Sequence, residues 1–139
     1  MVENMRVDHV AIAVNSVDEA LKNYEKIIRI DKIDIEEVPI ERVKVAILEL
    51  EDTRIELMEP TADDSPIKRF LTDRGEGIHH IAITADDIDS DVERAIANGT
   101  RMIGNIRTGS YGRKITFIHP KSMNGVLTEF CQAVSKDKK

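Results

Sequence analysis

Two histidines and two glutamates recur at nearly the same spacing in the two halves of this 139-residue chain. His9 and His80 are separated by 71 positions, and Glu56 and Glu129 are separated by 73. Imidazole and carboxylate groups are ligands that divalent first-row metal ions accept. If the two halves pack about a pseudo-two-fold axis, we expect the four side chains to converge on one ion. Such a site would leave positions for water or for a chelating substrate.

Each of these residues, taken singly, also has a simpler structural interpretation. A strand histidine is commonly half-buried, and a strand glutamate commonly points to solvent from the polar face. The matched spacing of all four favours the metal site. A glutamate flanked by apolar residues in mid-strand is costly to bury unless a partner compensates its charge.

The segments around these residues repeat in the same way. Each histidine lies in an apolar stretch typical of a strand, at residues 7–14 and 77–84. Apolar residues then recur at helical spacing from Val17 and again from Ile88. Each half continues in strands, and each glutamate lies in the last of them. An internal repeat of this kind predicts two copies of one structural unit.

We therefore predict an α+β fold in which two tandem βαβββ modules form curved mixed sheets around a shared metal cleft. The first module spans residues 7–58, the second spans 78–133, and a linker occupies 59–77. Pro66 predicts the start of a short helix in the linker, because proline suits the first helical turn. The segment Gly104–Gly112 is expected to be a loop with at most a short strand. A chain of this length can form one compact domain.

Composition and charge exclude several classes of function. The net charge of −6 argues against non-specific binding of nucleic acid, which requires a basic surface. No apolar run approaches the roughly 18 residues of a membrane span, and the first residues do not resemble a signal peptide. Cys131 is the single cysteine, so an internal disulfide is excluded. We expect a cytoplasmic protein with no membrane partner.

Three further residues, His79, Cys131 and His119, could take part in chemistry. The sequence favours a structural role for the first two and leaves the role of the third open. His79 precedes His80 and must face the opposite side of a strand, which favours a structural role. Cys131 is expected to pack in the core. His119 lies in a turn, where contact with an anionic substrate group and a purely structural role are equally favoured.

The chain resembles the vicinal-oxygen-chelate (glyoxalase/bleomycin-resistance) superfamily and, within it, the methylmalonyl-CoA epimerases, from Val7 to about Ala133. The His–Glu pattern is shared by the superfamily. The Ser-Pro-Ile and His-Pro-Lys segments, with two loop glycines, are more specific to the epimerases. The segments that carry the resemblance are Asp8–Val14, Arg54–Pro60, Asp64–Ile67, Gly77–Ala82, Phe117–Lys121 and Gly125–Glu129, with Gly109 and Gly112.

The resemblance implies a divalent metal ion held by His9, Glu56, His80 and Glu129. Some relatives carry an amide where Glu56 stands. Cobalt is the expected ion, with manganese, magnesium, nickel and zinc as alternatives. The family's acyl-CoA substrate implies contacts from Ser65, His119 and Lys121, and small domains of this superfamily commonly form homodimers.

The implied reaction interconverts (R)- and (S)-methylmalonyl-CoA by removing the C2 proton through a metal-stabilised enolate. It requires an acid–base group on each face of C2. Glu129 resembles one of the two. A relative carries the other on its third strand, where Val45 stands here. Glu41 and Glu49 are the nearby carboxylates, and Glu41 is preferred.

Two other functions remain open. A glyoxalase I-like isomerase of the same superfamily also removes a proton next to a metal-bound carbonyl. A metal-free module that binds a small molecule would use the same fold without chemistry. A ring-cleaving dioxygenase is less favoured, because that chemistry usually uses two histidines and one carboxylate.

Overall fold

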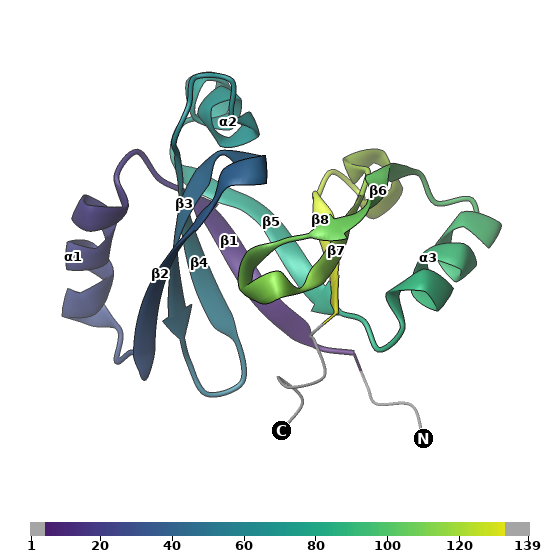
Figure 1. The fold of residues 1–139 in the computed structure, drawn as a ribbon, viewed down its shortest axis with the longest axis horizontal. Coiled ribbons are helices and arrows are strands. Elements are labelled where there is room, and N and C mark those ends of the chain that lie inside the picture. Colours follow the sequence, from purple (N-terminus) through teal and green to yellow (C-terminus); the bar gives the residue numbers. More distant parts are fainter. Residues whose placement is uncertain (1–4, 133–139) are drawn as a thin grey trace. The chain divides into compact units, whose positions relative to one another are not determined.

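The computed structural model describes residues 5–132 (Figure 1). Within this range the chain forms eight strands and three α-helices, which confirms the predicted α+β class. The chain divides into two compact units. The first unit comprises His9–His79, and the second comprises residues 80–132 together with the described residues before His9. The predicted end of the second module, at residue 133, lies outside the described residues.

The element order βαβββ occurs twice, as the sequence repeat predicts. The elements of the first copy and of the segment that follows it are β1 (Val7–Ala13), α1 (Val17–Ile27), β2 (Lys32–Val38), β3 (Val43–Glu49), β4 (Arg54–Pro60) and α2 (Pro66–Arg74). The elements of the second copy are β5 (Gly77–Thr84), α3 (Ile88–Ala97), β6 (Met102–Thr108), β7 (Lys114–Ile118) and β8 (Thr128–Gln132). The short helix predicted in the linker is α2, and it begins at the expected proline.

The first unit is a mixed sheet covered on one face by α1. Strand β3 pairs antiparallel with both β2 and β4, and β4 pairs parallel with β1. Helix α1 begins where the hydroxyl of Ser16 accepts a hydrogen bond from the backbone N–H of Glu19 at 3.1 Å. This cap satisfies one of the backbone donors that the first helical turn leaves open. The helix contacts β3 and β4.

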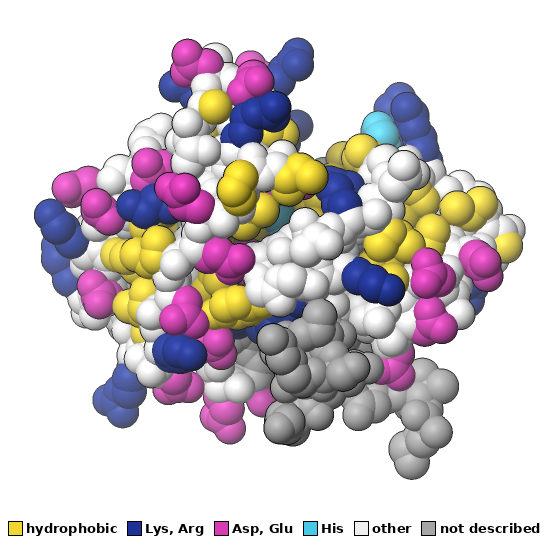
Figure 2. Space-filling view, in the orientation of Figure 1, with side chains coloured by type: hydrophobic (Ala, Val, Ile, Leu, Met, Phe, Trp, Pro, Cys, Tyr) yellow, Lys and Arg dark blue, Asp and Glu magenta, His cyan; other side chains and the backbone are white. Residues whose placement is uncertain are grey.

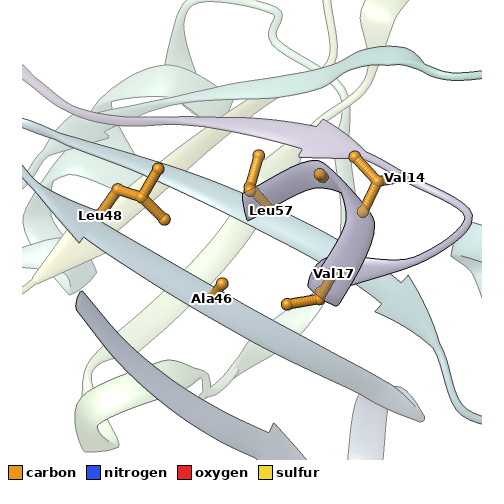
Figure 3. Packing of buried hydrophobic residues seen from close by; sticks show 6 residues of the cluster. Val14, Val17, Ala46, Leu48 and Leu57 are labelled. Carbon is orange, nitrogen blue, oxygen red and sulfur yellow. The ribbon is translucent and has the colours of Figure 1, made fainter. Parts of the chain in front are cut away.

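The apolar core of the first unit lies between α1 and the sheet (Figure 3). Val17 and Leu57 are both fully buried there. Successive residues of a strand point to opposite faces, so the neighbour of Leu57 in β4, Glu56, lies on the face away from α1. Glu56 is nevertheless only 4 % exposed, so the face of the sheet that carries it is also covered.

The second unit repeats this arrangement around α3. Strand β5 pairs parallel with β8, and β7 pairs antiparallel with both β8 and β6. Ile88 of α3 packs against Ile118 and Phe130 of the sheet. The residue before β1 also belongs to this unit: the backbone N–H of Arg6 donates to Oγ1 of Thr84 at 3.0 Å, and the N–H of Thr84 donates back to the carbonyl of Arg6 at 2.9 Å.

Strand β6 corrects the prediction of a loop at Gly104–Gly112. The strand spans Met102–Thr108 and pairs with β7 at both ends, and the register shifts between Ile103 and Arg107. Gly104 has a φ of 70° at this irregularity, a backbone conformation that favours glycine. The glycine that suggested a loop therefore marks a break in strand pairing, and the polar residues of β6 are tolerated because they are largely exposed.

The surface carries charges of both signs. Figure 2 shows lysine and arginine side chains interspersed with aspartate and glutamate over the face in view. Among the described residues, none of the helices has the length and apolar character that a membrane span requires.

Candidate metal and substrate site

The first His–Glu pair forms on neighbouring strands of the first unit. His9 of β1 lies opposite Arg54 of β4, and Ala11 lies opposite Glu56. Since side chains two positions apart share a face, His9 and Glu56 project from the same side of the sheet. Nδ1 of His9 lies 3.6 Å from Oε2 of Glu56. Both side chains are buried.

The second pair forms in the second unit, between β5 and β8. Ala82 lies opposite Glu129, and His80 precedes Ala82 by two positions. Nε2 of His80 lies 2.7 Å from Oε1 of Glu129. Both residues are only 3 % exposed. The ring of Phe117 contacts the His80 ring edge-on, with 5.1 Å between their centroids.

The two pairs have the same strand register. In each unit a buried alanine lies opposite the glutamate, and the histidine lies two residues before that alanine. The burial of all four side chains excludes the simpler interpretation in which the glutamates point to solvent.

These donors fit a divalent metal ion. Imidazole nitrogen and carboxylate oxygen are the ligands that such ions take in proteins, and each unit supplies one of each. Oε2 of Glu56 is buried and accepts no hydrogen bond from the described residues. A buried carboxylate oxygen with unused acceptor capacity costs free energy, which a bound cation would recover.

Two residues with expected structural roles have the expected surroundings. His79 makes an edge-on contact with Phe70, at 5.1 Å between centroids. Cys131 is buried and packs in an apolar cluster with Ala82 and Ile115.

Glu41 and Ser65 belong to one corner of the first unit. Glu41 ends a short 3₁₀ helix, Pro39–Glu41, between β2 and β3. Oγ of Ser65 lies 3.5 Å from the carbonyl oxygen of Glu41 and accepts a hydrogen bond from the N–H of Ile67 at 3.2 Å. Ser65 is 1 % exposed and caps α2, so its hydroxyl already has a structural function. Glu41 itself is half-buried.

His119 and Lys121 lie together after β7 in the second unit. Nδ1 of His119 accepts a hydrogen bond from the backbone N–H of Lys121 at 3.0 Å. Partial burial, together with the positive charges of Arg101 and Lys121, lowers the pKa of His119 below its ordinary value of 6.5. The lowered pKa favours the neutral imidazole, and the two neighbouring positive charges give surroundings that suit an anionic ligand.

Sequence reasoning did not single out Arg54 or Phe117, which lie beside the two His–Glu pairs. Nε of Arg54 is 3.9 Å from Oε2 of Glu56. Phe117 lies opposite Glu129 in the β7–β8 ladder. The period of two residues along β4 would have placed Arg54 on the face of Glu56. Phe117 required the register of two strands, which the sequence does not show.

Comparison with known proteins places this chain in a family. The model of the Glyoxalase/Bleomycin resistance protein/Dioxygenase superfamily matches residues 8–117. The mitochondrial methylmalonyl-CoA epimerase of Dictyostelium discoideum is 37% identical over 126 residues, which cover 89% of this chain and 76% of that protein. The ethylmalonyl-CoA/methylmalonyl-CoA epimerase of Cereibacter sphaeroides is 35% identical over 130 residues, covering 91% of this chain and 97% of that protein.

A solved structure of a methylmalonyl-CoA epimerase in complex with methylmalonyl-CoA and NH4+ superposes with a TM-score of 0.90. It is 33% identical in sequence, and the match covers 94% of this chain and 96% of that one. The resemblance predicted from the sequence motifs is thereby confirmed. The chain belongs to the glyoxalase/bleomycin resistance protein/dioxygenase superfamily, and methylmalonyl-CoA epimerases are among its relatives over almost its whole length.

Proposed function

We propose that this protein is a metal-dependent epimerase that interconverts (R)- and (S)-methylmalonyl-CoA. The observation that carries the proposal is the pair of buried His–Glu contacts at equivalent register in the two units. Relatives with this named activity, at 35 to 37% identity, support the substrate class. We also propose that the protein is cytoplasmic and forms a homodimer.

In this proposal His9, Glu56, His80 and Glu129 together hold one divalent ion. The two carboxylates balance a 2+ charge, so the buried site stays close to neutral. Cobalt is the first candidate, with manganese, magnesium, nickel and zinc as the alternatives. When bound, the ion would supply positive charge that favours the enolate formed as the C2 proton leaves.

Glu129 is proposed to move the proton at C2 as well. Its carboxylate is held beside His80 at 2.7 Å, and β7 places Phe117 directly opposite. A buried carboxylate is poorly solvated by water, so its charged form is less stable there and it accepts a proton more readily. Glu41 is the proposed group for the opposite face of C2, since it is a carboxylate on a turn that other residues hold in place. Glu49 is the alternative.

The remaining residues are proposed to bind or position the acyl-CoA. His119 and Lys121 would contact an anionic group of the substrate, because the charges of Arg101 and Lys121 make the surroundings of His119 positive. Ser65 is buried, so the proposal gives it an indirect part: its hydroxyl holds the turn that ends at Glu41.

Two measurements on the purified protein test this function. Metal analysis should find about one divalent ion per chain. Incubation of methylmalonyl-CoA in D₂O should then exchange the C2 proton and interconvert the epimers, and chelation should abolish both. A protein that binds no ion would be a metal-free binding module. Turnover of a glutathione hemithioacetal without C2 exchange would indicate a glyoxalase I-like isomerase.

A further inference from the structure

The surroundings of Glu56 contain a permanent positive charge. Arg54 precedes Glu56 by two positions in β4, so both side chains lie on one face of the sheet. Nε of Arg54 is 3.9 Å and Nδ1 of His9 is 3.6 Å from the same atom, Oε2 of Glu56. The carboxylate oxygen therefore lies near both a cation and an imidazole.

All three side chains are withdrawn from water. The exposed fractions are 11 % for the Arg54 side chain, 5 % for Glu56 and 4 % for His9. A charge buried to this degree is unfavourable unless an opposite charge lies nearby, because water no longer solvates it. An arginine guanidinium is a permanent cation. The nearness of Arg54 to Glu56 therefore stabilises both groups in the absence of a metal ion.

The second unit has no arginine at the equivalent position. The residue two places before Glu129 is Leu127, where the first unit has Arg54 before Glu56. The group that lies opposite Glu129 in the ladder is the ring of Phe117. The two glutamates of the repeat thus differ in electrostatic surroundings, although their strand registers are the same.

We propose that Arg54 is the counter-ion of Glu56 in the metal-free protein, and that it competes with the bound divalent ion for this carboxylate. This inference rests on the proposed function, because it assumes that Glu56 is a metal ligand. Arg54 is a positioning residue in this account: it touches no substrate and acts only through the Glu56 carboxylate. It stabilises the folded chain before metal loading and weakens the affinity of the loaded site.

The competition predicts that loss of the Arg54 charge lowers the stability of the metal-free protein and raises its affinity for metal. A purely structural role for Arg54 would not raise the metal affinity. Arg54→Met keeps much of the apolar stem and removes the charge. In the metal-free protein it should lower the midpoint of thermal unfolding, because Glu56 is left buried without its counter-ion. Its affinity for Co²⁺ should rise by about tenfold or more, because one nearby positive charge is gone. Arg54→Lys keeps the charge and should remain close to the wild type.

A double-mutant cycle assigns the effect to the correct carboxylate. Glu49 also lies opposite Arg54 in the β3–β4 ladder, so it provides the matched control. The gain in Co²⁺ affinity from Arg54→Met should disappear in a Glu56→Gln background and persist in a Glu49→Gln background. Calorimetric titration with Co²⁺ and thermal melting of the metal-free chains supply both readouts.

The outcomes separate this inference from the proposed function. A wild-type chain that binds no Co²⁺ overturns the proposed function and this inference with it. If the wild type binds Co²⁺ and Arg54→Met leaves the affinity unchanged or lowers it, only the inference fails. If Arg54→Met does not fold, Glu56→Gln provides the test. This variant removes the carboxylate charge 3.9 Å from Nε of Arg54, so it should lower the unfolding midpoint of the metal-free protein. An equal or higher midpoint overturns the inference.

Discussion

Oε1 of Glu129 lies 2.7 Å from Nε2 of His80, although α3, β6 and β7 separate their strands in the chain. The parallel pairing of β5 with β8 creates this contact. It places a histidine and a carboxylate side by side on the buried face away from α3.

The first prediction concerns His80. We expect His80→Ala to lose the bound ion and the C2 exchange activity while remaining folded, since a four-ligand site that loses one imidazole binds far more weakly. Elemental analysis of the purified variant and its circular dichroism spectrum measure the two effects. His79→Ala is the matched control, because the adjacent imidazole contacts Phe70 on the opposite face and should leave metal content unchanged. Full metal occupancy in His80→Ala would show that this ligand is misassigned.

The second prediction separates ligation from proton transfer at Glu129. Glu129→Gln keeps the shape of the side chain and one ligand oxygen but cannot take a proton. Metal should stay bound, with weaker affinity. C2 exchange from at least one epimer should fall by about 10²-fold or more, the usual contribution of a general base. If both epimers exchange at wild-type rates, the base lies elsewhere, and Glu41 is the next variant to measure.

The third prediction concerns the pH response of His119. The pKa of His119 is lowered from 6.5 in the folded chain. As the pH falls below 6.5, the unfolded chain therefore binds more protons at His119 than the folded chain does. The contribution of His119 to the free energy of unfolding is therefore complete above pH 6.5 and declines as the pH drops toward the folded-state pKa. His119→Asn, which can still cap the following turn, should remove this part of the decline.

A direct titration provides the check. The His119 ring resonances, followed by NMR against pH, should report a pKa below 6.5. Arg101→Gln should raise that pKa, because it removes one of the positive charges that oppose protonation. A pKa at or above 6.5 in the wild type, or no response to Arg101→Gln, would contradict the prediction.

The fourth prediction tests the core beneath the site. Leu57 is fully buried between the sheet and α1, so Leu57→Ala should reduce the free energy of unfolding by about 2–5 kcal/mol. Ile27 lies at the end of the same helix but is 83% exposed, and Ile27→Ala should change the free energy by no more than about 0.5 kcal/mol. Urea denaturation of both variants measures the difference, and equal losses would argue against the packing described for α1.

The fifth prediction is the oligomeric state. We expect a homodimer, so light scattering at micromolar concentration should report twice the chain mass of 15.7 kDa. Large apolar side chains such as Ile35 and Ile40 are at least half exposed in the single chain, which is consistent with a surface covered by a second copy. A mass of 15.7 kDa at every concentration would contradict this expectation.

The amino-acid sequence by itself determined the repeated βαβββ order, the α+β class and the identity of the four candidate ligands. These features depend on residue type, periodicity and spacing along the chain, all of which can be read without knowing how the strands pair. The spacing that Glu56 shares with Glu129 also favoured a buried role for this glutamate over one that points to solvent.

Tertiary structure decided which side chains became neighbours. The strand at Met102–Thr108 forms through pairing with β7. Its own residues show little apolar alternation, so the sequence predicts a loop with at most a short strand from Gly104 onward. The contact of Phe117 with His80 likewise required the register between strands. Register is set by backbone hydrogen bonds between segments far apart in the chain. For that reason the aromatic ring beside His80 emerged only from the folded structure, whereas the period of two residues along β4 was enough to place Arg54 on the face of Glu56.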